Sequence, residues 1–205
     1  SKYPITNAQF GEFIKSGGYA NRRWWTDVGW ENRQKETLIE PRFWRDSRWN
    51  SSEQPVVGVS WYEAIAFCSW LSNVTGENIM LPTEQQWQRA AQGNDGRIYP
   101  WGNDWNENRC HNAVDGYYSN CSTRVTEYEE EGNSPFGVVD MVGNVWEWCL
   151  TAYQTGLNDL DTINDRVLRG CSWNHKNINN FRCDSRNFRH PFTRDNNRGF
   201  RISRS

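Results

Sequence analysis

The sequence has few of the features that mark membrane-bound or exported proteins. No apolar run approaches the ~20 residues that a membrane-spanning helix needs, and the mean hydropathy is −0.93. The opening residues 1–6 lack the charged and apolar regions of a signal peptide. These absences argue against a spanning helix or a membrane partner, and we expect a cytoplasmic protein. Residue 1 already lies inside a folded unit by its pattern, so we also expect a longer chain with an N-terminal effector domain.

A strong charge of either sign is absent as well. The net charge is −2, which gives no electrostatic basis for a nucleic-acid partner. Three scattered His and six Cys without a C-x-x-C pair argue against a zinc site. Neither a serine nucleophile motif nor a phosphate-binding glycine loop is present. We expect free thiols in a reducing compartment, although the spacing leaves a bridge between Cys110 and Cys121 open.

The sequence is rich in large rings. It has 13 Trp in 205 residues, and aromatic residues reach 15% while all hydrophobic residues reach only 36%. Such a chain builds its core from a few large rings, such as Trp146, Trp148, Trp173 and Phe200, and holds its loops with polar networks. The low net charge and the many rings favour an ordered fold over disorder.

Local signals predict helices in the first half and short strands in the second. Capping boxes at Thr6, Ser60 and Thr83 predict helices that end before Gly17, Gly76 and Gly93. Residues 19–55 hold five Trp with little periodicity, which indicates an ordered loop. After residue 94, short apolar pieces alternate with Asn, Gly and Asp, which is typical of short strands and long loops. The chain is therefore predicted to be α+β with much irregular structure. The strand candidates are 138–139, 145–148, 167–168 and 200–202.

Seven motifs follow one another in a specific order. They are YPITNAQF (3–10), PVVGVSWYEA (55–64), LPTEQQW (81–87), YPWG (99–102), DMVGNVWEW (140–148), RGCSW (169–173) and GFR (199–201). In this order the chain resembles the formylglycine-generating-enzyme, or sulfatase-modifying-factor, family from end to end. The resemblance implies a C-type-lectin-like fold and a single domain over residues 1–205.

The resemblance also bears on catalysis. The oxidases of this family hold copper with two cysteines, of which the second matches Cys183 and the first would fall at Ile178. Because a Cu(I) site of this kind needs both thiolates, we expect no copper and no oxidase activity. A second catalytic branch makes sulfur–histidine compounds with iron bound by a separate helical domain, which is not among these residues.

Calcium is the metal that the resemblance implies. Family members bind it in the motif at 140–148, which assigns the ligands to Asp140, the carbonyls of Gly143 and Val145, and Glu147. Oxygen ligands from one tight turn suit this ion; the alternative is that Glu147 stabilises the turn without metal. A second family site would use Asn112 and a following acid, for which Asp115 is the candidate, although the sequence departs from the pattern here.

The stretch within 169–201 resembles the variable region of proteins diversified by retroelements. There, adenines are replaced, so that asparagine codons change to many others but never to Glu, Gln, Met, Trp or Lys. Residues 174–197 contain no Glu, Gln, Met or Trp, and Lys176 is the one exception. A fixed Asn-rich loop is the alternative. The expected variable, ligand-binding set is Asn174, His175, Asn177, Asn180, Phe181, Ser185, Phe188, Arg189, His190, Phe192 and Thr193.

These observations predict a non-catalytic domain that recognises changing partners, which we expect to be proteins, through diversified C-terminal loops. Rings, His, Arg and Asn combine apolar contact with adaptable hydrogen bonds, as antibody loops do. Two alternatives stay open. One is an oxidase with an altered copper site, and the other is a fixed accessory domain of a multidomain kinase or protease.

Overall fold

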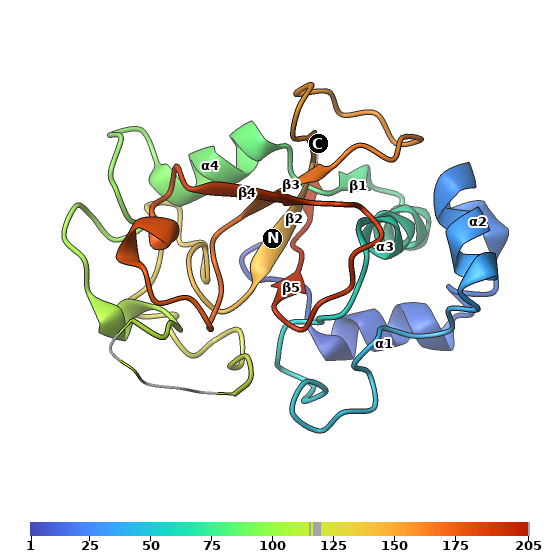
Figure 1. Cartoon of the computed structure of the whole chain (residues 1–205), viewed down its shortest axis with the longest axis horizontal. Coiled ribbons are helices and arrows are strands. Elements are labelled where there is room, and N and C mark those ends of the chain that lie inside the picture. The colour runs from blue at the N-terminus through green and yellow to red at the C-terminus, as the bar shows by residue number, and fades with distance from the viewer. Residues whose placement is uncertain (115, 117–119, 205) are drawn as a thin grey trace.

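A computed structural model of the chain describes residues 1–114, 116 and 120–204 (Figure 1). Its four helices are α1 (Asn7–Lys15), α2 (Asp27–Lys35), α3 (Trp61–Thr75) and α4 (Glu84–Gln92). Single 3-10 turns are η1 (Arg22–Trp24), η2 (Glu107–Arg109) and η3 (Ile178–Phe181). No described helix is both long enough and apolar enough to cross a bilayer.

The three capping boxes form as predicted. The side chains of Thr6, Ser60 and Thr83 each accept a hydrogen bond from the backbone N–H three residues later. The prediction for residues 19–55 was wrong in part, because this stretch also contains η1 and α2. Helix α2 has a cap at Thr26 but buries only Gly29 within its length. It therefore lacks the apolar stripe by which a helix is recognised in a sequence.

The strands form two small sheets. The larger sheet has the order β4-β3-β2-β5, and β1 pairs with β6 in the smaller one. Their bounds are β1 (Ile79–Met80), β2 (Trp146–Ala152), β3 (Arg166–Arg169), β4 (Arg186–Arg189), β5 (Arg198–Gly199) and β6 (Ser203–Arg204). Strand β5 runs parallel to β2, whereas β3 is antiparallel to both β2 and β4. Strand β4 is thus at an edge of the sheet.

The predicted strands at 145–148 and 167–168 are confirmed, although β2 continues four residues further, to Ala152, and the prediction is wrong at two other places. Residues 138–139 form no strand, and the apolar piece 200–202 lies between β5 and β6. Phe200 is fully buried, so burial rather than strand pairing explains why this piece is apolar. The prediction of an α+β chain with much irregular structure is confirmed.

Aromatic rings join the helices to the sheet. Phe10 of α1 stacks on Phe67 of α3 with ring centroids 5.4 Å apart, and both rings contact Phe200 edge-on. Trp148 packs in the same core, with its indole N–H donating to the carbonyl of Val59 at 3.1 Å. The core residues expected from the sequence, which are Trp146, Trp148, Trp173 and Phe200, are all buried.

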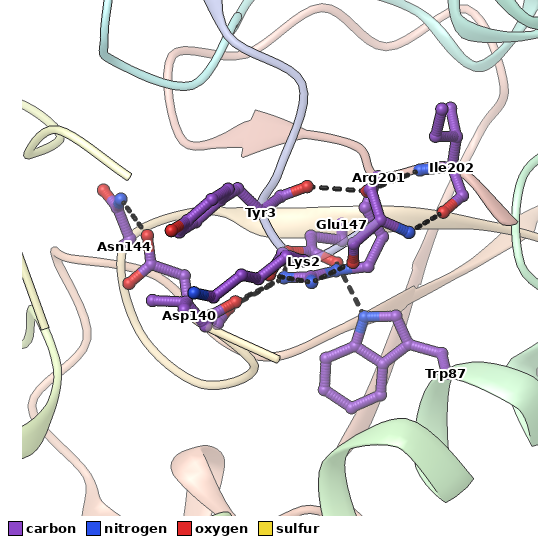
Figure 2. A network of polar contacts seen from close by, with 10 residues as sticks. Lys2, Tyr3, Trp87, Asp140, Asn144, Glu147, Arg201 and Ile202 are labelled. Carbon is purple, nitrogen blue, oxygen red and sulfur yellow. Dashed lines mark hydrogen bonds and ion pairs between the residues drawn. The ribbon is translucent and has the colours of Figure 1, made fainter. Parts of the chain in front are cut away.

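A buried ion pair connects the end of the chain to the centre of the sheet. The Arg201 guanidinium donates to both carboxylate oxygens of Glu147 at 2.6 and 2.7 Å, and the indole N–H of Trp87 donates to the same carboxylate at 2.7 Å. Figure 2 shows Trp87 and Arg201 meeting at Glu147. Arg201 also donates to the carbonyl of Val139 at 2.9 Å. The Glu147 carboxylate therefore links β2 to α4 and to the C-terminal segment. Arg201 extends this link to the loop before β2.

Candidate ligand-binding surface

Buried arginines fix the backbone that carries the C-terminal surface. Arg169 is 1% exposed and donates to the carbonyls of Cys183, Asp184 and Ser185 at 2.7 to 3.0 Å. A guanidinium presents several donors in a rigid fork, so one side chain holds this whole turn. Because carbonyls are its acceptors, the turn keeps its shape whatever side chains it presents.

A second arginine anchors the segment between β4 and β5. Arg194 forms an ion pair with the buried carboxylate of Glu63, to which it donates at 3.0 Å, and it also donates to the carbonyl of Glu40 at 2.6 Å. The Tyr19 hydroxyl donates to the same carboxylate, and burial together with Glu63 holds the pKa of Tyr19 well above its usual value. Glu63 also caps α3 through the N–H of Ser60 at 2.8 Å. The segment is thus bound to the start of α3.

Ten of the eleven predicted ligand-binding side chains are exposed or half-buried. The exception is Phe181, which is fully buried and packs on Trp105 with ring centroids 5.2 Å apart. The turn of η3 directs this ring into the core, so its assignment to the surface was wrong. The other ten are Asn174, His175, Asn177, Asn180, Ser185, Phe188, Arg189, His190, Phe192 and Thr193.

Side-chain contacts place five of these ten residues in three parts of the surface. His175 contacts Asn180 beside Trp146. Phe188 of β4 stacks on Tyr153 with centroids 4.3 Å apart. His190 contacts Phe192. Figure 1 shows that the chain passes from η3 through β4 and back to β5 on one side of the molecule.

The third part borders a groove that sequence reasoning missed. Phe192 and Thr193 line one wall of a groove of about 910 Å³, and α2 with the segment after it lines the other. Phe192 is held there by its contact with Tyr62 of α3, with centroids 5.2 Å apart. Ile163, which is 60% exposed, lies at the same groove. Nothing in the sequence brings α2 close to residue 192, because the contact is created by the fold alone.

The protonation of His175 follows from its contacts. The Trp146 indole can only donate, and it donates to Nε2 of His175 at 3.1 Å. Nδ1 then carries the proton of the neutral ring, and because it faces Nδ2 of Asn180 at 3.1 Å, that amide must be turned to present its oxygen. Burial, and then the charges of Arg189 and Arg198, lower the pKa of His175. These surroundings favour the neutral ring of His175.

The residues at the two family copper positions do not fit a copper site. Ile178 is 38% exposed on η3, while Cys183 is fully buried and packs with Trp87 and Met141. Burial raises the pKa of the Cys183 thiol to about 12. No disulfide joins any of the six cysteines, all of which lie among the described residues. Across residues 1–114, 116 and 120–204, no three His, Cys, Asp or Glu side chains are placed to hold a metal ion.

The expected calcium ligands differ in how well their surroundings suit a cation. Asp140 is buried, and while one carboxylate oxygen accepts from Asn144 at 2.9 Å, the other has no partner. Burial raises the pKa of Asp140 to about 7, so an adjacent cation would stabilise its charged form. Gly143 has a φ of +84°, and a Cβ there would lie 2.6 Å from the carbonyl of His111, so the turn requires glycine. Glu147, in contrast, already accepts three hydrogen bonds (Figure 2).

Asp140 therefore fits a cation, and Glu147 would have to share its carboxylate with Arg201. At the second expected site, Asn112 uses its amide oxygen to accept from the N–H of Val114 at 3.0 Å. Its predicted partner, Asp115, lies outside the described residues.

Known proteins resemble this chain over its full length. An inactive C-alpha-formylglycine-generating enzyme 2 from Mus musculus is 31% identical, over 99% of this chain and 73% of the relative. A hercynine oxygenase from Mycobacterium tuberculosis is 30% identical over 98% of the chain, which spans about half of that relative's length. The serine/threonine-protein kinase pkn1 of Chlamydia caviae is 27% identical over 98% of the chain and 32% of the kinase.

Solved structures share the fold. PvdO from Pseudomonas aeruginosa superposes over the whole chain with a TM-score of 0.73 at 22% identity, and 78% of PvdO is covered. Treponema denticola variable protein 1 superposes over 74% of the chain and 71% of that protein, with a TM-score of 0.62 at 22% identity. These likenesses agree with the expected C-type-lectin-like arrangement of helices and curled sheets. The sulfatase-modifying factor enzyme 1-like domain matches residues 1–205, and the chain belongs to this formylglycine-generating-enzyme family.

Proposed function

We propose that this chain is a non-catalytic binding domain whose exposed C-terminal loops recognise protein partners and are diversified by a retroelement. The observation that carries the proposal is that the side chains expected to contact ligand are separate from the buried contacts, here called the frame, that hold their backbone. Ten predicted contact residues are exposed or half-buried, whereas their backbone is held by Arg169 and Arg194 through interior contacts. A surface built in this way can change its side chains without losing its shape.

The site chemistry supports a role without catalysis. A two-thiolate copper site is not available at Ile178 and Cys183, and Cys183 is buried. A relative that covers nearly the whole chain is itself described as inactive. The hercynine oxygenases are enzymes by name, but the chain spans only about half of their length, and their activity cannot be carried over from this part.

The composition of the loop supports diversification. The exposed positions carry residue types that adenine replacement can produce, and the types it cannot produce are absent from 174–197 except for Lys176. The fold is shared with a protein named for its variability. The kinase relatives favour the second candidate, in which this domain presents partners to a fused catalytic domain. Both candidates use the same binding surface.

Calcium remains part of the proposal as a structural ion at Asp140 and the carbonyls of Gly143 and Val145, with Glu147 as a shared ligand. The unpartnered buried oxygen of Asp140 supports it. A bound cation would supply the positive charge that this carboxylate lacks. It would stabilise the turn behind the binding surface and take no part in ligand contact.

Alanine substitutions at Phe188, Arg189 and His190 together should weaken binding to a partner selected from a library of native proteins. Aromatic and Arg contacts at the centre of an interface contribute most of its energy, so we expect a loss of roughly 100-fold or more. Calorimetric titration measures the Kd. Alanine at Glu12 and Lys15, which form an exposed pair on α1, is the matched control and should change it less than twofold. An unchanged Kd in the triple variant would contradict the proposal.

Copper(I) should not bind tightly through Cys183. In a competition titration against a Cu(I) chelator, the wild type and Cys183→Ala should give the same weak affinity, because one buried thiol offers only half of the required ligand set. Circular dichroism checks that the variant stays folded. Tight copper binding that disappears in Cys183→Ala would instead restore the oxidase alternative.

Calcium should raise the free energy of unfolding, by about 2.7 kcal/mol when its concentration is about 100 times the Kd. Since the pKa of Asp140 is about 7, the ion must displace a proton at low pH, and the effect should be larger at pH 8 than at pH 6. Urea unfolding with calcium, magnesium or a chelator measures it. Asp140→Asn should abolish the difference, and an equal effect of calcium on this variant would refute the site.

A further inference from the structure

Strand β4 is paired along one edge and open along the other. It stands at the end of the order β4-β3-β2-β5, and each of its residues is in register with a residue of β3 (Figure 1). In the described part of the chain no strand pairs with its second edge. Three of its four residues are exposed. An open edge of this kind presents N–H and carbonyl groups that another strand could pair with.

The hydrogen bonds of the sheet show which way each residue faces. Within a strand, a residue directs its N–H and carbonyl to one side, and the next residue directs its own to the opposite side. The N–H of Trp146 in β2 donates to the carbonyl of Asn197, directly before β5, at 2.9 Å. The backbone groups of Glu147 therefore point to β3, where Glu147 is paired with Arg169. This pairing turns the backbone groups of Arg169 toward β2.

The same alternation determines which groups of β4 lie at the open edge. Leu168 precedes Arg169, so its backbone groups point away from β2 and toward β4, where it is paired with Asn187. The backbone groups of Asn187 point back to β3. Those of Phe188 and of Arg186 therefore point out of the sheet.

Both outward groups of Phe188 are bound by the side chains of its two neighbours. Its N–H donates to Oδ1 of Asn187 at 2.8 Å, and its carbonyl accepts from Nη1 of Arg189 at 2.7 Å. The same Nη1 donates to Oδ1 of Asn187 at 3.0 Å. These bonds agree with the outward direction inferred from the register. Neither side chain belongs to the buried core, so this cap can open without disturbing the fold.

The surface beside the open edge combines a ring with positive charge. Phe188 is 39% exposed and is held in place by its stacking on Tyr153, with centroids 4.3 Å apart. Among the described residues Arg189 pairs with no carboxylate and donates to neutral oxygens only. Residues 174–197 carry five basic and two acidic side chains in a chain whose net charge is −2. The edge therefore suits a segment with apolar and acidic side chains.

We propose that β4 binds an extended, acidic segment of the protein partner as an added strand, with the N–H and carbonyl of Phe188 as its backbone contacts. An extended backbone has the donors and acceptors that an open strand edge lacks. The added strand replaces the cap, which frees Arg189 to pair with an acidic side chain of the partner. This site rests on the proposed function and specifies the form of the ligand. Backbone contacts do not depend on side chains, so one part of the affinity stays constant while the surface varies.

Short linear peptides test the strand edge without an identified partner. Peptides that the wild-type protein enriches from a random library serve as probes, and fluorescence anisotropy measures their Kd. Each probe is made in two further versions, with N-methyl groups on alternate amides in one or the other phase. Because alternate amides of a strand point to opposite sides, one version should bind roughly tenfold more weakly or worse, and the other should stay within about twofold.

Proline at position 188 tests the same contact from the side of the protein. Phe188→Pro and Phe188→Ala both lose the ring, but only Phe188→Pro loses the outward N–H. A strand edge tolerates proline where the N–H faces outward. We expect Phe188→Pro to bind the probes roughly fivefold to tenfold more weakly than Phe188→Ala. Circular dichroism checks folding, and the methylated peptides test the wild type if the proline variant does not fold.

Equal effects of the two methylation phases would overturn the proposal. Equal binding by Phe188→Pro and Phe188→Ala, or a library without binders, would do the same. This failure is distinct from failure of the proposed function. If the alanine triple variant loses its protein partner while the two methylation phases act alike, the binding surface stands and strand addition does not. If one phase abolishes peptide binding but the triple variant keeps its partner, the reverse holds.

Discussion

The buried ion pair of Glu147 and Arg201 is the interaction on which the rest of the structure depends. It joins β2 to the last residues of the chain, and through Trp87 and the carbonyl of Val139 it reaches α4 and the loop before β2. A buried carboxylate is tolerated only when its lone pairs are used, and three donors meet that need here. Removing either partner of such a pair generally costs about 3–5 kcal/mol. The pair also fixes the C-terminal end of the segment that carries the binding surface, since Arg201 lies two residues after the end of β5.

Other buried arginines also donate hydrogen bonds to backbone carbonyls. Arg166 is fully buried, with its guanidinium 3.9 Å from the Trp61 ring centroid and a hydrogen bond of 3.0 Å to the carbonyl of Leu150. Arg169 and Arg194 bind carbonyls of the C-terminal loop and of the segment after α2. With only 36% hydrophobic residues, the chain fixes long loops by guanidinium forks rather than by regular strands. Backbone acceptors do not change when side chains are replaced, and a varied surface therefore becomes compatible with one fold.

Much of the frame could be predicted from the sequence, because its signals are local. A capping box such as that of Thr6 and Gln9 is completed within four residues, and the helices it predicts are present. Helix α2 was missed because only Gly29 is buried within its length, so the sequence shows no apolar stripe there. Phe181 was placed on the surface because the direction of a side chain from a 3-10 turn is set by tertiary packing, in this case against Trp105.

The central claim is that a fixed frame carries a surface that changes, and comparison of this gene among independent isolates tests it most directly. The codons of residues 169–201 would be sequenced deeply, together with any nearby reverse transcriptase and imperfect copy of this stretch. The account predicts substitutions at adenine positions, concentrated in the codons of exposed residues such as Asn174, Phe188 and His190, with Phe181, Arg194 and Arg201 unchanged. A stretch that is invariant among isolates, or that varies as much at the buried positions as at the exposed ones, would contradict it.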